Sequence, residues 1–250
     1  MRLLKLHRCD ALIDTILFDN WNTLVQAPGL MRGGASVEIF QRSLRDQGLE
    51  YDRDGFVEAY RGVARRQVAE AEANGWTEID YLRRLLTVLE RLGVAEPRRS
   101  RLAVGAWGDY LSEWPRQTSF YPETPAVLDG LRGRYRLGVV TNFMDGPTAR
   151  TVFAALGYDA IFDSLVVSAE VGYMKPSKVV FERALGELGS TPGNTVMVGD
   201  SYEADVVGAH AAGMRGVLID LEGAPETQLR ASDAVIKGIG GFPEALKRLA

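Results

Sequence analysis

The pattern of apolar and polar residues first singles out a short stretch near the N-terminus. An unbroken apolar run, Ile16-Leu17-Phe18, stops on Asp19 and is followed by a polar segment. Such a run is typical of a strand buried on both faces of a parallel sheet, and the polar segment predicts a loop at its carboxyl end. Ligands bind at that end of the strands in open α/β sheets. Asp19 is therefore the first candidate for function.

The segment from residue 25 to residue 118 has a helical pattern instead. Apolar residues recur there at helical spacing in four successive runs. We therefore expect an all-helical module in this segment. The runs are Val37, Phe40 and Leu44; Phe56, Tyr60, Val63 and Val68; Leu82, Leu85, Leu86, Leu89 and Leu92; and Ala103, Ala106, Trp107, Tyr110 and Leu111.

Local signals mark the ends of two of these helices. Thr77, followed three residues later by Asp80, resembles a capping box at the start of the third helix, and Gly93 follows its last periodic leucine. Pro115 is expected to end the fourth helix after Trp114. The aromatic face of the fourth helix either packs in the core of the module, which we favour, or faces a substrate.

Beyond Tyr121, strand-like and helix-like patterns alternate, which is typical of βαβ units that feed a parallel sheet. The predicted strands cover residues 136–141, 164–168, 195–199, 216–219 and 233–236. The predicted helices cover 125–131 after a Thr124 cap, 147–157, 178–188 after a Ser177 cap, 203–212, and a last segment from Phe242.

The connectivity assigns the first strand to this later α/β part. Its own neighbours in sequence are helical, whereas the strands that could pair with it begin only after residue 135. The simplest arrangement joins residues 1–24 and 119–250 into one Rossmann-like α/β domain, a parallel sheet flanked by helices. Residues 25–118 are then an inserted helical cap above the carboxyl edge of the sheet.

Composition and charge narrow the classes of function. The 250 residues are 46% hydrophobic and 25% charged, which is ordinary for a soluble globular protein. The formal net charge of -4 gives no broad basic footprint, so we expect neither nucleic acid nor a membrane surface as a partner. We interpret the local basic clusters, Arg83 with Arg84 and Arg98 with Arg99 and Arg101, as solvated helix faces.

Cysteine and histidine usage fits a cytoplasmic protein without a zinc site. Cys9 is the single cysteine and cannot form an intramolecular disulfide, while His7 and His210 lack neighbours at ligand spacing. The segment Met1 to Arg8 has no apolar run long enough for a signal peptide or a membrane span, and we expect a short extension there. The sequence does not fix the oligomeric state, and a homodimer is compatible with it.

Several predicted strands end in polar residues that could act together. Each residue has a simple alternative role; Asp200 with Glu203, for example, also fits a capping box. Parallel strands nevertheless bring their carboxyl ends to one edge of the sheet. Neighbouring carboxylates repel unless a cation lies among them, and oxygen ligands without His or Cys favour Mg²⁺. The residues are Asp19; Thr141 with Asn142; Lys175; and Asp200 with Asp205.

This combination suits phosphoryl transfer. Asp19 would attack the phosphorus and form an aspartyl-phosphate, while Thr141 and Lys175 would hold the phosphoryl oxygens. Mg²⁺ would offset charge in the transition state. The resulting hypothesis is a Mg²⁺-dependent phosphatase whose substrate is a small-molecule phosphate ester.

At this point four motifs resemble those of the haloacid dehalogenase-like hydrolase superfamily, in the same order and spacing. They are Phe18-Asp19 with Thr23-Leu24, Val139-Val140-Thr141-Asn142, Lys175-Pro176, and the segment from Val198 to Asp205. The resemblance implies a Rossmann-like core, a nucleophilic Asp19, and a helical cap that opens and closes over the site and selects the substrate. It also implies Mg²⁺ bound by Asp19, the backbone carbonyl of Trp21 and Asp200, with support from Asp205, and phosphate contacts from Thr23, Thr141, Asn142 and Lys175.

One position departs from the phosphatases of that superfamily. Those phosphatases carry a second aspartate two residues after the nucleophile, and this second aspartate protonates the leaving group and later activates water. This chain has Trp21 at that position. An indole N–H only donates hydrogen bonds and can do neither. General acid–base help worth roughly 10²–10⁴-fold is then absent or comes from another group. Trp21 could instead act as a wedge against the cap, or simply pack.

Two other functions stay open. Haloacid dehalogenases also lack the second aspartate and commonly have an aromatic tyrosine there, but they resemble one another in a metal-free fourth motif that contains Ser and Asn, unlike Asp200 and Asp205. A weakly active or non-catalytic protein that binds a phosphate ligand or a partner is the other alternative, and Trp21 is its only support.

Overall fold

The strand predicted before Asp19 lies inside a six-stranded parallel sheet. The computed structural model describes residues 12–31 and 34–249, so the expectations for Cys9, His7 and the first eight residues lie outside it. The strand order is β5-β4-β1-β6-β7-β8, and Phe18 of β1 lies between Val139 and Val198. The strands are β1 (Thr15–Phe18), β4 (Arg136–Thr141), β5 (Ser164–Val167), β6 (Thr195–Gly199), β7 (Arg215–Ile219) and β8 (Ala234–Ile236). Each predicted strand is confirmed to within one residue at either end.

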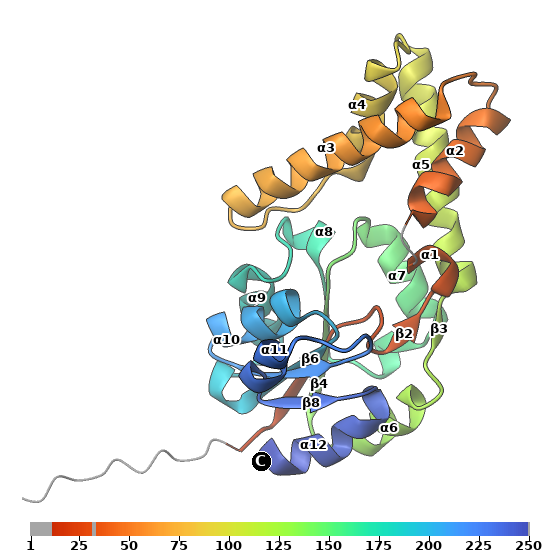
Figure 1. Cartoon of the computed structure of the whole chain (residues 1–250). Coiled ribbons are helices and arrows are strands. Elements are labelled where there is room, and N and C mark those ends of the chain that lie inside the picture. Colours follow the sequence, from red (N-terminus) through yellow and green to blue (C-terminus); the bar gives the residue numbers. More distant parts are fainter. Residues whose placement is uncertain (1–11, 32–33, 250) are drawn as a thin grey trace, which may run out of the picture.

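Helices cover both faces of this sheet (Figure 1). Alternation along β1 sends Ile16 and Phe18 to one face and Leu17 to the other. The Leu17 face packs against α9 (Lys178–Leu188) and α10 (Gly208–Ala211). The opposite face packs against α6 (Thr124–Leu131), α7 (Gly146–Ala155) and α12 (Phe242–Leu249). The fold is thus the Rossmann-like α/β class expected from the sequence.

The remaining long helices lie together beyond one edge of the sheet, and we call them the cap helices (Figure 1). They are α2 (Ala35–Asp46), α3 (Arg53–Ala73), α4 (Tyr81–Arg91) and α5 (Arg98–Gln117). Shorter elements are α1 (Pro28–Met31), α8 (Ser168–Val171), α11 (Glu226–Ala231), a π-helix over Tyr202–Val207, and 3-10 turns at Tyr158–Ala160, Pro192–Asn194 and Ile239–Gly241. In the part of the chain that the structure describes, no helix is long and apolar enough to cross a membrane.

The chain leaves and re-enters the α/β part side by side. β2 (Val25–Gln26) pairs antiparallel with β3 (Ser119–Phe120), a contact that the sequence analysis missed because two residues carry no measurable periodicity. The two crossings are therefore hydrogen-bonded to each other at the predicted boundaries. For this reason we propose that residues 25–118 form a cap unit on the core of residues 1–24 and 119–250.

Several expectations about the cap helices were wrong. Asp80, not Thr77, caps α4, because its carboxylate accepts from the Arg83 N–H at 2.8 Å. α5 begins at Arg98 and runs through Pro115 to Gln117, since the packing of the 5% exposed Trp114 outweighs the hydrogen bond that proline removes. Val68, expected on a buried face, is 43% exposed.

Two caps in the α/β part also differ from expectation. Thr124, expected as the cap of α6, is instead the first residue of that helix, and Glu123 precedes it. The Thr124 hydroxyl donates to the Leu24 carbonyl at 2.8 Å. The segment after β6 begins as a π-helix capped by the Ser201 hydroxyl, which accepts from the Ala204 N–H. The alternative of a capping box between Asp200 and Glu203 is therefore wrong.

The loop between α3 and α4 pairs with the loop that precedes Lys175. Thr77 and Tyr173 form an isolated antiparallel bridge. Glu78 N donates to the Gly172 carbonyl at 2.9 Å, and Met174 N donates to the Trp76 carbonyl at 2.7 Å. This pairing, which we call the loop bridge, fixes part of the cap against the α/β part.

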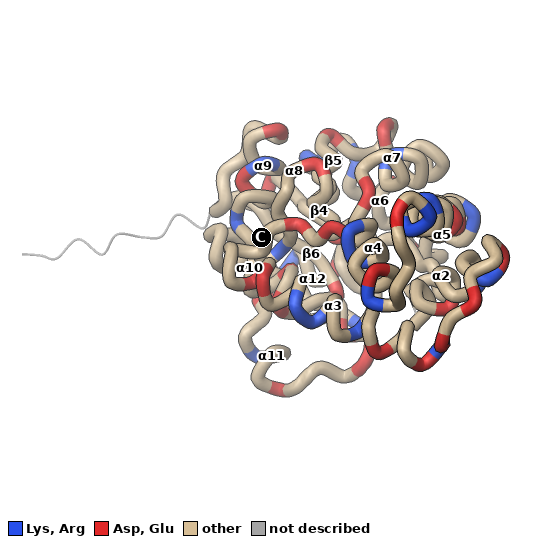
Figure 2. Tube along the Cα trace, turned by 90° about the horizontal axis from the view of Figure 1, so that it is seen from above, with Lys and Arg blue, Asp and Glu red and all other residues tan. Residues whose placement is uncertain are grey.

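Basic and acidic residues are interspersed along the cap helices (Figure 2). Arg99, from one of the basic clusters, pairs with Glu90 at 2.7 Å and Glu96 at 2.8 Å. Arg98 and Arg101 are exposed, so the solvated-face interpretation holds for these two, whereas Arg99 is half-buried.

Candidate active site

Asp19 continues β1 by one residue into the edge of the sheet. Its N–H donates to the Val198 carbonyl at 2.8 Å, which extends the pairing with β6, and the residue is 7% exposed. Burial raises the pKa of Asp19 to about 7; Lys175 opposes this rise, and the neighbouring Asp205 and Asp200 add to it. A carboxylate in this setting needs nearby positive charge to stay ionised at neutral pH.

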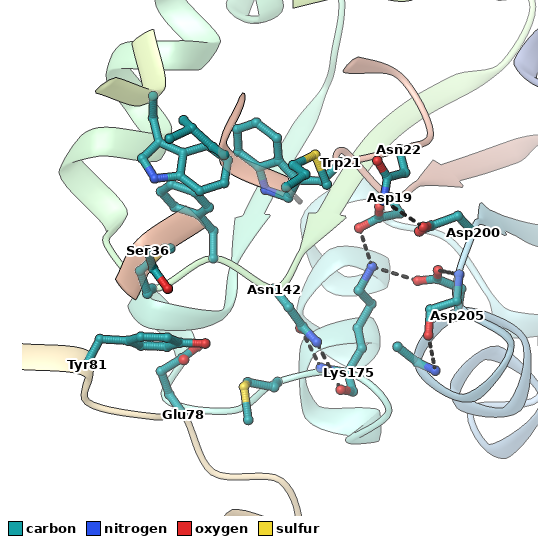
Figure 3. A pocket seen from close by; sticks show the side chains of 18 of the residues that line it. Asp19, Trp21, Asn22, Ser36, Glu78, Tyr81, Asn142, Lys175, Asp200 and Asp205 are labelled. Carbon is teal, nitrogen blue, oxygen red and sulfur yellow. Dashed lines mark hydrogen bonds and ion pairs between the residues drawn. The ribbon is translucent and has the colours of Figure 1, made fainter. Parts of the chain in front are cut away.

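Lys175 supplies the positive charge. Its Nζ donates to Asp19 Oδ1 at 2.6 Å and to Asp205 Oδ1 at 2.7 Å (Figure 3). Burial alone would lower the pKa of Lys175, but the two carboxylates outweigh it and raise the pKa above its ordinary value. The three side chains thus form a buried, charged triad that brings residues 19, 175 and 205 together.

Asn142, predicted to bind substrate, holds the backbone of Lys175. Its Oδ1 accepts from Lys175 N at 2.7 Å, and its Nδ2 donates to Lys175 O at 3.0 Å (Figure 3). Asn142 also lines the cavity over Asp19. Both polar ends of the amide are engaged, so this side chain acts here as a positioning group.

Asp200 and Asp205 are oriented by local backbone geometry. Asn22 adopts the left-handed region (φ 58), which asparagine tolerates, and its Nδ2 donates to Asp200 Oδ2 at 3.0 Å. Asp205 Oδ2 accepts from Ser201 N at 3.0 Å. A Cβ on Gly199 would lie 2.0 Å from Asp205 Oδ2, so glycine is required for this approach.

The acidic residues fit a hard divalent cation. One carboxylate oxygen from each of Asp19, Asp200 and Asp205 lies within 4.8 Å of the others. Lys175 offsets only part of their charge, and burial, followed by the charge of Asp205, raises the pKa of Asp200. Oxygen donors at this spacing match the ligand preference of Mg²⁺.

Trp21 lies between the α/β part and the cap. Its ring stacks on Phe143 at a centroid distance of 5.1 Å and meets Trp114 of α5 edge-on at 4.5 Å. Its Nε1 is buried, with no hydrogen-bond partner among the described residues. The side chain thus packs against α5, as both the wedge role and simple packing predict.

Thr23 and Thr141 are placed differently from the other predicted residues. Both are 1% exposed, and each Oγ1 is buried without a hydrogen-bond partner among the described residues. Thr23 lines a separate cavity of about 440 Å³ together with Tyr121 and Lys237. Thr141 ends β4 but is not among the residues that line the cavity over Asp19.

The cavity over Asp19 has a volume of about 550 Å³, and cap residues that the sequence analysis did not select form its far wall. Tyr110 and Trp114 give the aromatic face of α5 a role in the site as well as in packing. Arg84, interpreted from the sequence as solvated, is 6% exposed and lines the cavity. A signal was available, because Arg84 shares a helix face with Tyr81 and Val88. The cap residues of this wall are Tyr60, Glu78, Tyr81, Arg84, Tyr110 and Trp114.

Glu78 places a further carboxyl group in this cavity, on the cap side. Figure 3 shows Glu78 and Tyr81 across Asn142 from Asp19 and Asp200. Glu78 Oε1 accepts from Ile79 N at 2.9 Å, whereas Oε2 is buried without a hydrogen-bond partner among the described residues. Burial raises the pKa of Glu78. The loop bridge holds this residue over the site.

Fold and site together define a class, the Rossmann-like α/β proteins that carry a buried carboxylate at the end of a central parallel strand. Comparison with known proteins gives the family. The model of the haloacid dehalogenase-like hydrolases matches residues 13–213, and the chain belongs to this family. The resemblance inferred from the four motifs is confirmed.

Relatives with assigned activities include phosphatases. The chain is 30% identical to ribulose-1,5-bisphosphate 5-phosphatase of Halopiger xanaduensis, over 82% of this chain and 84% of that protein. It is 31% identical to glyceraldehyde 3-phosphate phosphatase of Methanopyrus kandleri, over 83% of this chain and 84% of that protein. Among solved structures, a 2-haloacid dehalogenase from Pseudomonas syringae pv. Tomato superposes with a TM-score of 0.73 at 25% identity, covering 96% of this chain and 100% of that one.

Proposed function

We propose that this hydrolase is a Mg²⁺-dependent phosphatase of small phosphate esters that acts through an aspartyl-phosphate on Asp19. The observation that carries the proposal is the buried triad, in which Lys175 joins Asp19 to Asp205 with contacts of 2.6 and 2.7 Å. The relatives support it, since ribulose-1,5-bisphosphate and glyceraldehyde 3-phosphate are both small phosphate esters.

The reaction divides into two displacements at phosphorus. A carboxylate oxygen of Asp19 forms a bond to phosphorus while the ester P–O bond breaks, and the leaving alkoxide takes a proton from water. Water then attacks the aspartyl-phosphate, which releases inorganic phosphate and restores Asp19. Lys175 holds one phosphoryl oxygen. Thr141, whose buried hydroxyl lies outside the cavity lining, stays the donor that the motif resemblance implies for another. We keep Asn142 as the group that positions Lys175 for this contact.

Asp19, Asp200 and the backbone carbonyl of Trp21 would hold the metal, with Asp205 in support. When bound, Mg²⁺ would stabilise the negative charge that develops on the phosphoryl oxygens. Lys175 and Asn22 orient two of these carboxylates through hydrogen bonds to Asp19 and Asp200.

Trp21 shapes the substrate preference. Because indole cannot protonate a leaving group, aryl and acyl phosphates, whose leaving groups need little protonation, should react faster than sugar phosphates. Without general acid help the expected difference is roughly 10²–10⁴-fold. Equal rates on both classes would contradict this part of the proposal.

The test is a phosphatase panel on four proteins: wild type, Asp19→Asn, Trp21→Asp and Trp21→Ala. Asp19→Asn should abolish hydrolysis. Losing the buried Trp21 ring costs about 3–5 kcal/mol, so Trp21→Ala is the control that separates lost packing from a new acid. Alkyl-ester activity gained by Trp21→Asp but not by Trp21→Ala identifies the missing acid. Activity lost equally in both variants shows that the ring itself is needed.

A 2-haloacid dehalogenase is the second candidate, because one such enzyme superposes on nearly the whole chain. The acidic group of Asp19, Asp200 and Asp205 favours the phosphatase. Release of halide from L-2-chloropropionate in excess EDTA would reverse the choice. Binding of beryllofluoride with Mg²⁺ but no turnover that Asp19→Asn abolishes would instead identify a phosphate-binding protein.

A further inference from the structure

A buried cation lies in the cap wall of the cavity. Arg84 of α4 is 6% exposed, and its guanidinium carbon lies 4.3 Å from the ring centre of Tyr81 and 5.3 Å from that of Tyr60. Nε donates to Gln67 Oε1 at 2.7 Å, and Nη1 donates to Tyr60 Oη at 3.3 Å. Among residues 12–31 and 34–249, no carboxylate pairs with this guanidinium within 4.0 Å.

An arginine in this state is expensive to keep. A charge taken out of water loses its hydration, and neutral hydrogen bonds return only a part of that free energy. Cation–π contacts return a further part. If Arg84 only braced α3 against α4, a neutral side chain could hold Gln67 and Tyr60 without that cost. The unmatched charge therefore indicates a ligand that supplies the missing anion.

The position of Arg84 fits the non-reacting end of a substrate. Figure 3 places Tyr81, on whose ring Arg84 lies, across the cavity from Asp19. One cavity of about 550 Å³ is lined by both Asp19 and Arg84, a size suited to a small metabolite. Glu78 is the one carboxylate among the described cap residues that line this cavity, and no ion pair within 4.0 Å joins it to Arg84. The positive charge at this wall is thus not cancelled.

We propose that Arg84, with the Tyr60 hydroxyl, binds a second anionic group of the substrate, either a carboxylate or a second phosphate. The preferred substrates are then phosphate monoesters of anionic alcohols, not of neutral ones. This inference rests on the proposed phosphatase function and assigns the substrate class for that site. Arg84 is a specificity-determining residue in this scheme, because it contacts the end of the substrate that does not react.

Matched substrate pairs test the proposal. One arm compares 3-phosphoglycerate with glycerol 3-phosphate, and the other compares ribose 1,5-bisphosphate with ribose 5-phosphate. A charge-assisted hydrogen bond contributes about 1.5–3 kcal/mol, so wild type should prefer the anionic member by roughly 10–150-fold in kcat/KM. A preference for the anionic member in the first arm alone indicates carboxylate recognition, and a preference in the second arm alone indicates phosphate recognition.

The variants separate recognition from bracing. Arg84→Gln should reduce that preference to within about threefold, with the change mainly in KM for the anionic member. Arg84→Lys, which retains the charge, should keep part of it. Arg83→Gln is the matched control, since Arg83 is the exposed neighbour on the same helix and should leave the ratio unchanged.

Two results would overturn the inference: equal kcat/KM for both members of each pair in wild type, or an equal loss on both members in Arg84→Gln. If Arg84→Gln does not fold, the wild-type ratios together with Arg84→Lys still decide. Failure of the phosphatase proposal looks different, because then no member of either pair is hydrolysed in a reaction that Asp19→Asn abolishes.

Discussion

Replacing Lys175 by methionine removes the cation at the centre of the site and keeps a similar side-chain volume. Lys175 is 3% exposed, and Nζ contacts Asp19 Oδ1 at 2.6 Å and Asp205 Oδ1 at 2.7 Å. In Lys175→Met both carboxylates stay buried without this partner. Asp200, within 4.8 Å of both, adds to their mutual repulsion.

The structure sets the size of the effect. Removing one partner of a buried ion pair costs about 3–5 kcal/mol, because the remaining charge is buried and uncompensated. Two carboxylates depend on Lys175, so we expect the upper part of that range in EDTA. Saturating Mg²⁺ should recover a part of the loss by neutralising the same carboxylates.

Urea unfolding of wild type, Lys175→Met, Asp205→Asn and the double variant measures this directly, with and without Mg²⁺. The double variant should be less destabilised than the sum of the two single variants, by about 1–3 kcal/mol, since the residues are in contact. A cost below about 1 kcal/mol for Lys175→Met, or additive costs in the cycle, would refute the claim that Lys175 holds the site together.

Three further predictions concern single features of the site. Gly199→Ala places a Cβ 2.0 Å from Asp205 Oδ2, so it should lower the free energy of unfolding by about 2–3 kcal/mol and remove most activity. The control Gly186→Ala, whose Cβ would have nothing within 4 Å, should raise the free energy of unfolding by about 0.5–1 kcal/mol. Equal effects of the two variants in urea unfolding would contradict the steric reasoning. Burial raises the pKa of Glu78, so the folded state binds this proton more tightly than the unfolded state does. The free energy of unfolding therefore falls as the pH rises from the unfolded-state pKa of Glu78 through its higher folded-state pKa. Glu78→Gln should therefore gain stability on wild type as the pH rises above the ordinary pKa of a glutamate, and parallel curves in thermal unfolding would exclude this cause. Excess EDTA should lower phosphatase activity by roughly 10³-fold and added Mg²⁺ should restore it, because a metal supplies several kcal/mol of transition-state stabilisation; full activity in EDTA would remove the metal from the proposal.

The strand ends could be predicted from the sequence because parallel strands share an edge. Asp19, Lys175, Asp200 and Asp205 follow apolar runs that are unambiguous, and the sheet brings them together without any knowledge of side-chain packing. The helical insertion was visible for a similar reason, since helices of this length carry a clear period.

The cap side of the cavity could not be predicted in the same way. Arg83 and Arg84 are adjacent and chemically identical, yet one is exposed and the other is buried against Tyr60 and Tyr81. The helical period places Arg84, and not Arg83, on the face of Tyr81 and Val88. Whether this face lines a cavity depends on how α4 packs on α3, and the period alone does not show that. Thr77 and Asp80 show the same limit. The sequence allows either residue to cap α4, and only the structure shows that Thr77 pairs with Tyr173 in the loop bridge while Asp80 is the cap.

The loop bridge has a consequence for local motion. Its two backbone hydrogen bonds together contribute about 1–3 kcal/mol. A loop that opened would lose only these two bonds, because the left-handed Trp76 (φ 67) belongs to the turn that ends α3, where its N–H donates to the Ala71 carbonyl. We therefore expect this loop to open locally, by the loss of two hydrogen bonds, without unfolding of the cap helices.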